Sequence, residues 1–447
     1  MKIFILNPPI YGKKKSLMRV RKRQPLSLAY IASLLRDKHE IIFLDANVLD
    51  YDADETVKKI KEAGPDILIL TSSPVDRWEC PNSHIDSVFK IIDRAQVENT
   101  ILIGSHGSAT PDWVFEKCQV KFIVRGESEL TTTNLIEAIQ NNRDLRKISG
   151  ISFRENNEIF HNAPAPRIEN LDSLPFPAYD LLPMEKYSYT QPDLPQPFSI
   201  MLTSRGCPFS CIFCLKIMMP GKYIARSPEN VIQEIKYLID KFGIESIFFQ
   251  DWEFLIDKER VRKICELILE NNLKFKWGCN ARLNDIEEEL VGIMKKAGCR
   301  RINIGLESGS QKILNQAKKG INVQDLERVA KILRENQVHL GAYGLLNLPG
   351  ENRATIKETV GLFEKNKIQA INFNLAIPYF GTELFEKLQK NQKFTWGNIE
   401  DYAGRVETEL SPFWARFYLR HFKFRSQFGR FYFFNPRFYQ KIISRLI

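Results

Sequence analysis

The chain of 447 residues contains 44% hydrophobic residues and carries a formal net charge of +10. This length predicts two or three domains with hydrophobic cores, and the lack of an 18-residue apolar run excludes a membrane-spanning helix. The eight cysteines are scattered apart from one group of three, which excludes a secreted disulfide framework and favours a reducing cytoplasm.

Residues 1–142 alternate short apolar segments with amphipathic helical ones. The expected strands are KIFILN, EIIFLDA, DILILTSS, TILIGS and KFIVRGE. Continuous apolar strands separated by helices predict a Rossmann-like, doubly wound parallel sheet that is covered on both faces. Such sheets bind ligands at the carboxyl ends of their strands. The side chains and glycines at those ends are Asn7, Ser72, Ser73, Gly104, His106, Gly126 and Glu127.

The next segment, residues 146–197, predicts a connection between domains. GISFRENNEIFHN at 150–162 is typical of a β-hairpin that turns at Asn156 and Asn157. Residues 163–197 contain eight prolines, so they predict a stiff, extended linker.

From Phe198 the alternation of strands and helices begins again. Six expected strands, from FSIMLTS to AINFNLAIP, fall within residues 198–390. An eightfold barrel of this type needs about 250 residues, so the shorter segment predicts an open, partial (β/α)6 barrel.

Three cysteines, Cys207, Cys211 and Cys214, follow the first barrel strand within eight residues. Barrel active sites lie at this end of the strands. A [4Fe–4S] cluster is usually held by four cysteines, so three would leave one iron free to bind a small molecule. The alternatives are a zinc site with a distant fourth ligand, or three cysteines without a shared role.

The spacing C-x-x-x-C-x-aromatic-C after the first strand of a partial barrel resembles that of the radical S-adenosylmethionine (SAM) enzymes. The resemblance continues along the barrel with DWEF at 251–254, NAR at 280–282, GLESGS at 305–310 and GLLNLPGE at 344–351. It implies a [4Fe–4S] cluster on the three cysteines, with SAM bound to the free iron and cleaved to a 5′-deoxyadenosyl radical. It also implies SAM contacts from Phe213 and Asn347 at the adenine, Asp251 and Glu253 at the amino group, Arg282 at the carboxylate, and Glu307 and Ser308 at the ribose. Asn347 replaces the glycine usual in the family. Taken singly, each of these charged residues has the alternative of being an ordinary surface charge. The interpretation depends on their position at the same end of the barrel, in the order along the chain that the family has.

The N-terminal segment resembles the cobalamin-binding class of these enzymes. The similar stretches are LNPP at 6–9, residues 25–47, GSHGSATP at 104–111, VRGESE at 124–129 and LDSLPFPAYDLL at 171–182. The resemblance implies that the strand-end residues named above contact cobalamin. His106 is expected near the nucleotide tail and not on cobalt, because the D-x-H-x-x-G pattern of cobalt-ligating histidines is absent. The alternative is a Rossmann-like domain that has lost cofactor binding.

The C-terminal segment 411–447 holds eight Arg or Lys, thirteen aromatic residues and no Asp or Glu. Such a segment favours packing over the open side of the barrel or contact with an anionic membrane surface. Stacking on single-stranded nucleic acid is the least favoured of the three interpretations.

We therefore predict four parts: a cobalamin-binding domain at 1–145, a hairpin and linker at 146–197, a radical SAM barrel at 198–390 and an extension at 391–447. The predicted reaction is methylation of an unactivated carbon in a small-molecule, lipid or peptide substrate. The alternatives are a cobalamin-associated oxidative cyclase and a non-catalytic redox-sensing or lipid-surface protein. A flavodoxin or ferredoxin is expected as electron donor, and the expected location is the cytoplasm, at the periphery of the inner membrane face.

Overall fold

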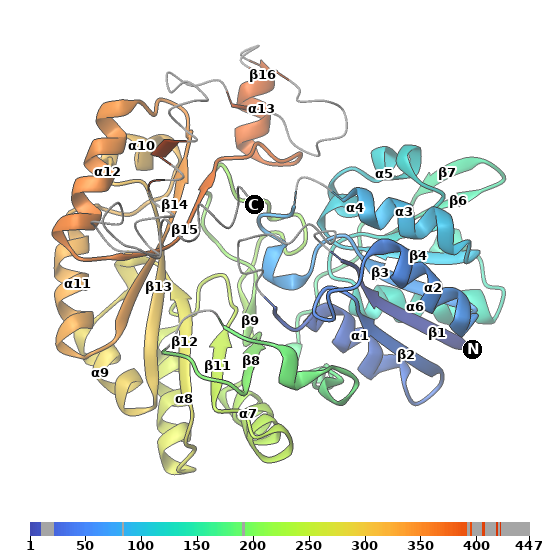
Figure 1. Ribbon diagram of the computed structural model, residues 1–447, viewed down its shortest axis with the longest axis horizontal. Coiled ribbons are helices and arrows are strands. Elements are labelled where there is room, and N and C mark those ends of the chain that lie inside the picture. The colour runs from blue at the N-terminus through green and yellow to red at the C-terminus, as the bar shows by residue number, and fades with distance from the viewer. Residues whose placement is uncertain are drawn as a thin grey trace, which may run out of the picture.

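The computed structural model describes residues 1–9, 22–82, 85–189 and 193–390, together with 394–395, 405–406, 417–418 and 421. Two α/β units lie side by side, an N-terminal unit in blue and cyan and a second unit in green, yellow and orange (Figure 1). Most of residues 11–23, which include seven Lys or Arg, and all but three residues of the segment 411–447 lie outside the described residues.

The N-terminal unit is built on a seven-stranded sheet with the order β2-β1-β3-β4-β5-β6-β7. Its elements are β1 (Lys2–Asn7), α1 (Leu26–Leu35), β2 (Glu40–Asp45), α2 (Ala53–Ala63), β3 (Ile67–Thr71), α3 (Asp86–Ala95), β4 (Asn99–Ile103), α4 (Ser105–Ala109), α5 (Pro111–Lys117), β5 (Phe122–Val124), α6 (Glu129–Gln140), β6 (Ile151–Glu155) and β7 (Glu158–His161). Strands β1 to β5 run parallel, and β6 and β7 form an antiparallel edge. The predicted parallel sheet is confirmed.

Alternation of side chains along β1 shows why this sheet is covered on both faces. Phe4 and Leu6 pack into one apolar cluster with α2, α3 and α5, whereas Ile3 and Ile5 pack into another with α1 and α6. The strand order reverses between β1 and β3, which is where open α/β sheets form ligand crevices.

The predicted hairpin is formed by β6 and β7, and it pairs with β5. Asn156 and Asn157 have φ angles of 50° and 65°, a left-handed conformation that asparagine tolerates in such two-residue turns. The hairpin therefore completes the N-terminal sheet, and the extended linker begins after it.

The second unit is a six-stranded parallel sheet with the order β15-β14-β13-β12-β11-β8, curled into a partial barrel with helices on its outer face (Figure 1). Its elements are β8 (Phe198–Met201), β9 (Ser204–Arg205), β10 (Ile224–Ala225), α7 (Pro228–Phe242), β11 (Ser246–Phe249), α8 (Lys258–Glu270), β12 (Lys276–Ala281), α9 (Glu288–Lys296), β13 (Cys299–Glu307), α10 (Gln311–Gln316), α11 (Asp325–Glu335), β14 (His339–Leu346), α12 (Arg353–Lys365), β15 (Gln369–Leu375) and α13 (Glu383–Lys390). A two-stranded pair, β16 (Phe394–Thr395) and β17 (Arg405–Val406), follows. The predicted partial barrel is confirmed.

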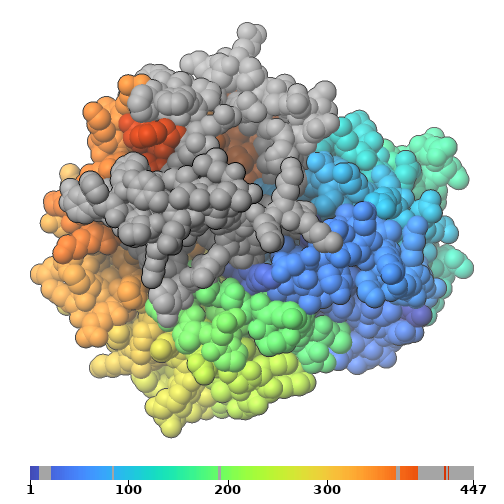
Figure 2. Space-filling view, viewed as in Figure 1, coloured from blue at the N-terminus to red at the C-terminus, as the bar shows by residue number. Residues whose placement is uncertain are grey.

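The two units share one apolar core. Tyr30 and Trp78 from the N-terminal unit belong to the same buried cluster as Tyr179 and Tyr187 of the linker and Phe248 of the barrel. The blue N-terminal surface runs directly into the green surface that follows it in the chain (Figure 2). The linker is therefore packed between the units and does not hang free as a spacer.

An amide side chain of the N-terminal unit also covers the edge of the barrel sheet. Gln24 donates to the carbonyl oxygen of Phe198 at 2.9 Å and accepts from the backbone nitrogen of Ile200 at 3.1 Å. Strand β8 is an edge strand of the barrel sheet, so some of its backbone groups lack a partner strand. Gln24 forms hydrogen bonds with two of these groups.

Within the described ranges, no helix is both long enough and apolar enough to cross a membrane.

Candidate functional site

The carboxyl-end loops of the two sheets meet each other. The backbone nitrogen of Leu215, after β8, donates to the carbonyl oxygen of Glu79, after β3, at 3.3 Å. The hydroxyl of Tyr379, after β15, donates to the carbonyl oxygen of Pro81 at 2.7 Å. Because both sheets place their ligand-binding ends at this junction, any site there is shared between the two units.

The three cysteines predicted as metal ligands lie in one loop, here called the cysteine loop (residues 206–215), at this junction. All three are partly exposed. Burial raises the pKa of Cys207 and Cys214, and the nearby Cys211 thiol raises both further. In the part of the chain that the structure describes, no three His, Cys, Asp or Glu side chains already form a metal site. The fit to an iron–sulfur cluster therefore rests on the donor set, three thiols on one loop.

The start of the cysteine loop is fixed by Asp251, at the end of β11. Its carboxylate accepts from the backbone and hydroxyl of Thr203, at 2.8 and 2.9 Å, and from the backbone and hydroxyl of Ser204. Asp251 is fully buried, and burial raises its pKa. Predicted as a neighbour of the SAM amino group, Asp251 is thus occupied in holding the backbone that leads into the loop.

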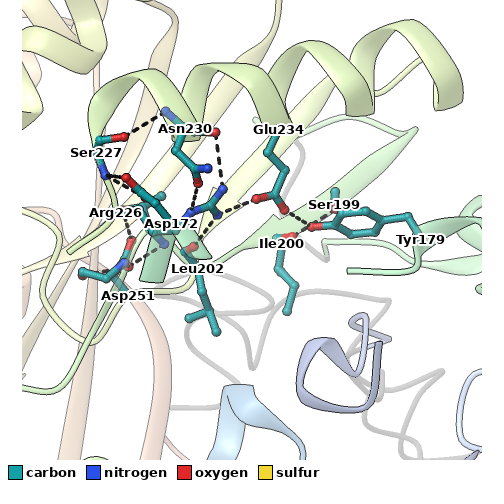
Figure 3. A network of polar contacts seen from close by, with 12 residues as sticks. Asp172, Tyr179, Ser199, Ile200, Leu202, Arg226, Ser227, Asn230, Glu234 and Asp251 are labelled. Carbon is teal, nitrogen blue, oxygen red and sulfur yellow. Dashed lines mark hydrogen bonds and ion pairs between the residues drawn. The ribbon is translucent and has the colours of Figure 1, made fainter. Parts of the chain in front are cut away.

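A second buried network supports the same backbone from the outer side (Figure 3). Arg226 donates to the carbonyl oxygen of Leu202 at 2.9 Å and forms an ion pair with Glu234 of α7. The hydroxyl of Tyr179 in the linker donates to Glu234 at 2.6 Å. At the start of α7, Ser227 caps the helix and its backbone nitrogen donates to Asp172. The linker therefore contacts α7 and, through Glu234 and Arg226, is connected to the backbone at Leu202 that leads toward the cysteine loop.

Glu253 lies near the cysteine loop, where burial raises the pKa of Cys207 and the charge of Glu253 raises it further. It is 8% exposed, and its Oε2 atom is buried without a hydrogen-bond partner. Burial raises the pKa of Glu253 to about 8, although Lys319 and Arg282 oppose this shift. A buried carboxylate with an unused acceptor fits a cationic ligand group such as an ammonium, because such a group would supply both charge and donors.

Arg282 and Glu307, predicted at the SAM carboxylate and ribose, lie near Glu253, and Lys319 connects them. The ammonium of Lys319 lies 3.0 Å from Glu307 Oε1, and Arg282 donates to the carbonyl oxygen of Lys319. The guanidinium of Arg282 lies 3.6 Å from the ring centre of Phe209 in the cysteine loop. A Cβ at Gly305 would lie 2.6 Å from both Glu307 and Lys319, so glycine leaves the space for this ion pair.

Lys319 was not predicted from the sequence. It follows α10 and is one of two adjacent lysines, and nothing in that pattern marks it as different from a solvated surface residue. Its burial, at 6% exposed, and its pairing with Glu307 become visible only in the folded chain.

The residues predicted for the adenine lie on the β14 side of the barrel. Phe213 packs partly exposed against an apolar cluster that includes Ile313 and Leu348. Asn347 has a φ of 72°, which explains why a glycine would suit this position and why asparagine can replace it. Ser308 is fully buried, and its hydroxyl accepts from the backbone nitrogen of Ser310 at 3.2 Å. Its hydroxyl is thus engaged in the turn after β13.

At the N-terminal strand ends, Asn7 has an unused acceptor. Its side-chain nitrogen donates to Asp45 at 2.8 Å, while its Oδ1 atom is buried without a hydrogen-bond partner. Asp45 also accepts from the hydroxyl of Tyr187 in the linker at 2.7 Å. A small cavity of about 10 Å³ lies beside Asn7 at the reversal between β1 and β3, where Ser72 and Pro74 also line it.

The other strand-end residues mostly bond to one another. Ser73 accepts from the backbone nitrogen of Ser105 at 2.9 Å, and Ser72 donates to a backbone carbonyl at 3.3 Å. Gly104 has a φ of 108°, and a Cβ there would lie 2.8 Å from the Ser72 hydroxyl, so these loops touch closely. Gly126 has open space around it. The residues present fit a ligand held mainly by backbone and by Asn7.

His106 and Glu127 are both buried in this unit. His106 is fully buried with its Nε2 atom 2.8 Å from the carbonyl oxygen of Asn82, and burial lowers its pKa to about 4. Glu127 accepts from Arg205 at 3.1 Å and from Arg167 at 2.7 Å. Its carboxylate therefore binds the barrel and the linker.

A cavity of about 720 Å³ lies elsewhere, between α6 and the start of the linker. Of the predicted site residues only Glu127 lines it. We therefore locate the candidate site from the positions of the predicted side chains at the junction of the two units, and not from cavity volume.

Comparison with known proteins gives two family matches along the chain. The Radical SAM superfamily matches residues 201–363, and the B12 binding domain matches residues 22–136. An uncharacterised methyltransferase of Pyrococcus horikoshii is 34% identical over 408 residues, which cover 90% of this chain and 86% of that protein.

Two further similarities bear on fold and function. The anaerobic magnesium-protoporphyrin IX monomethyl ester cyclase of Rubrivivax gelatinosus is 28% identical over 81% of this chain and 66% of its own length. The solved structure of the radical SAM methyltransferase TsrM from Kitasatospora setae, with cobalamin and a [4Fe–4S] cluster bound, has a TM-score of 0.69 at 19% identity. It covers 87% of this chain and 75% of its own, and it shows the same fold.

Proposed function

We propose that this chain, which belongs to the cobalamin-binding radical SAM enzymes, methylates an unactivated carbon of a substrate held between its two units. The enzyme class and its three cofactors, a [4Fe–4S] cluster, SAM and cobalamin, agree with the expectation from the sequence. The single observation that carries the proposal is the meeting of the two carboxyl ends, where Glu79 contacts Leu215 and Pro81 contacts Tyr379.

The chain's own residues would hold the cofactors as follows. Cys207, Cys211 and Cys214 bind the iron–sulfur cluster, and Glu253 binds the ammonium of SAM through its unpartnered oxygen. Arg282 faces the SAM carboxylate, with its ring contact to Phe209 fixing the guanidinium plane. When bound, these cofactors supply hydrogen-atom abstraction and a transferable methyl group.

Lys319 positions the ribose-binding carboxylate. Its ammonium pairs with Glu307 at 3.0 Å, so the carboxylate is held in place before the ligand arrives. Phe213 and Asn347 border the adenine, and Asn347 takes the left-handed conformation that glycine adopts readily. Asn7 and the backbone around Gly126 hold cobalamin on the opposite side of the junction.

The proposed function predicts a fixed ratio of products. The full chain would be reconstituted anaerobically with iron, sulfide and cobalamin, and incubated with reductant and SAM labelled in its methyl group. Small-molecule, peptide and lipid fractions of a cell extract would be added separately. The fraction that contains the substrate should take up the label, with 5′-deoxyadenosine and S-adenosylhomocysteine formed in nearly equal amounts.

Other product patterns would contradict methyl transfer. 5′-Deoxyadenosine without S-adenosylhomocysteine would favour an oxidative cyclisation, which the name of the Rubrivivax relative describes for that protein. Neither product with any fraction would favour a non-catalytic redox-sensing or lipid-surface protein. The control is Cys214→Ala, which should lose 5′-deoxyadenosine while cobalamin stays bound, because the substituted residue lies in the barrel.

The proposal includes an electron donor of the flavodoxin or ferredoxin type, because cleavage of SAM at the cluster consumes one electron. It also keeps the cytoplasm as the location. The membrane role of segment 411–447 stays a prediction from its charge and aromatic content.

A further inference from the structure

Four charged side chains form a buried group, here called the Arg205 clamp, between the N-terminal unit, the linker and the barrel. Arg205 donates to Glu127 at 3.1 Å and to Glu129 at 2.8 Å, and Arg167 donates to the second oxygen of Glu127 at 2.7 Å. Two arginines and two carboxylates balance each other in charge. The side chains of Arg205, Glu127 and Glu129 are at most 3% exposed.

The Arg205 clamp is tied directly to the cysteine loop. Arg205 is the last residue of β9 and stands two positions before Cys207. Gly206, between them, has a φ of 84°, and a Cβ there would lie 2.2 Å from the Lys222 carbonyl oxygen, so only glycine fits this closely packed turn. Arg205 is thus anchored with a single residue between it and the first cysteine of the loop.

The clamp also holds the chain that leaves the loop. The guanidinium of Arg167 donates to the carbonyl oxygen of Pro220 at 2.7 Å, and the carbonyl oxygen of Lys222 lies at 3.5 Å. Glu127 additionally accepts from the backbone nitrogen of Ile168 at 3.0 Å. Both ends of the segment that carries the three cysteines thus depend on carboxylates that belong to the N-terminal unit.

We propose that Arg205 is a positioning residue through which Glu127 and Glu129 of the cobalamin-binding unit set the geometry of the cysteine loop. A planar guanidinium that forks across two carboxylates fixes direction as well as distance, which a single charge contact would not do. The iron–sulfur site then takes its working geometry only while the N-terminal unit is docked. This inference rests on the proposed function, because it requires a cluster on the three cysteines.

The contacts distinguish this role from a general contribution to stability. A buried ion pair is often replaceable by apolar residues without loss of stability, so burial alone does not explain two carboxylates on one arginine. Asp251 already fixes Thr203 and Ser204 from within the barrel. Arg205 is the next residue, and its side chain is anchored from the other unit.

The test uses the full chain with both carboxylates replaced by amides of the same shape, E127Q together with E129Q. The matched control is Asp180→Asn, because Asp180 and Arg36 form a two-pronged pair, at 2.9 and 2.7 Å, that joins α1 to the linker without contacting the loop. Each protein is loaded with cluster and cobalamin. The readouts are bound iron, the electron paramagnetic resonance (EPR) spectrum of the reduced cluster with and without SAM, and retained cobalamin.

The expected result is an altered EPR spectrum in the double variant, a weaker response of that spectrum to SAM, and SAM cleavage reduced by about tenfold or more, as for one lost charge-assisted contact. Bound cobalamin is measured on the same samples, and the spectra are compared at equal cobalamin content. The Asp180→Asn control should match the wild-type spectrum even where its melting temperature falls. The R205K variant should show less than half of the wild-type change in the EPR spectrum on addition of SAM, because an ammonium cannot bind two carboxylates in the fixed geometry of a guanidinium.

A double variant whose spectrum and SAM response equal those of the wild type would overturn the inference. If that variant does not fold, R167Q decides, because Arg167 is the more exposed member and its loss removes the contacts to Glu127, Pro220 and Lys222 while Arg205 keeps both carboxylates. R167Q should change the spectrum in the same direction by a smaller amount, and an unchanged spectrum would overturn the inference. A wild-type chain that binds no cluster would overturn the proposed function as well, which separates the two failures.

Discussion

Replacing Glu253 with Gln should weaken SAM binding by about ten- to a hundredfold while leaving the cluster in place. The substitution keeps the size of the side chain and removes the ionised form, which burial disfavours in the free protein, where the pKa is about 8, and which a bound ammonium would favour. Glu253 is 8% exposed and its Oε2 atom has no partner within the described structure, so this oxygen is available to accept from an ammonium. The cysteines are unchanged, so iron binding should persist.

The magnitude follows from the environment of the carboxylate. Two unit charges 4 Å apart attract by about 4 kcal/mol at the effective dielectric constant of about 20 that suits protein sites. Stripping both groups of water offsets part of this attraction, and measured hydrogen bonds to charged groups contribute about 1.5–3 kcal/mol. Since each 1.4 kcal/mol is a factor of about ten in affinity, the loss spans about one to two orders of magnitude.

The assay is equilibrium dialysis of labelled SAM against cluster-loaded protein, with iron content measured on the same samples. The control is Glu287→Gln, since Glu287 is 55% exposed and its pair with Lys258 lies on the outer surface, where such pairs contribute about 0–1 kcal/mol. A dissociation constant for Glu253→Gln within about threefold of the wild type, at equal iron content, would refute the assignment of the ammonium to Glu253.

Replacing the three cysteines of the cysteine loop with Ala should abolish iron binding on anaerobic reconstitution, whereas replacing the buried Cys265 should not; iron retained by the triple variant would refute the ligand set. Burial raises the pKa of Asp45 from 3.8 to about 6, so the folded protein binds more protons than the unfolded chain in that window and loses stability as the pH rises through it. Two pKa units equal about 3 kcal/mol. The unfolding free energy of Asp45→Asn relative to wild type, measured with urea, should therefore increase by up to about this amount between pH 4 and pH 6.5. A difference in unfolding free energy that does not change with pH would contradict the raised pKa. If segment 411–447 binds anionic membrane, the full chain should sediment with acidic vesicles, and salt should release it. Replacing Arg416, Arg420, Lys423 and Arg430 with Gln should reduce both the sedimentation and the salt-dependent release. Equal sedimentation of this variant and the wild type would remove the membrane role of the segment.

Most of the fold could be predicted because its signals are local. Each parallel strand is a short apolar run between amphipathic helices, and Asn156-Asn157 marks the hairpin turn by its own backbone preference. The attachment of that hairpin to β5 was not visible in the sequence, because pairing between strands depends on contacts that no local pattern encodes.

The candidate site was predictable to the extent that strand ends define it. Glu253, Arg282 and Glu307 lie together because the carboxyl ends of parallel strands meet at one edge of the barrel. The partners of the charged residues were not predictable. Glu127 and Arg205 are 78 residues apart in the chain, and each looks like a strand-end charge until the two units dock.

Internal contacts already occupy several of the polar groups at the strand ends, and this narrows what can bind a ligand. Asp251 accepts hydrogen bonds from Thr203 and Ser204. Ser308 and Glu127 are likewise bonded within the protein, to Ser310 and to Arg205. Among the predicted site residues, Glu253 of the barrel and Asn7 of the N-terminal unit each have a buried oxygen without a hydrogen-bond partner in the described structure. A buried acceptor left unpaired costs about 1–3 kcal/mol, which a donor on a bound molecule would offset. Glu253 lies in the part of the chain that matches the Radical SAM superfamily, and Asn7 ends β1 of the sheet whose other parallel strands match the B12 binding domain, so each is a candidate contact for a different cofactor.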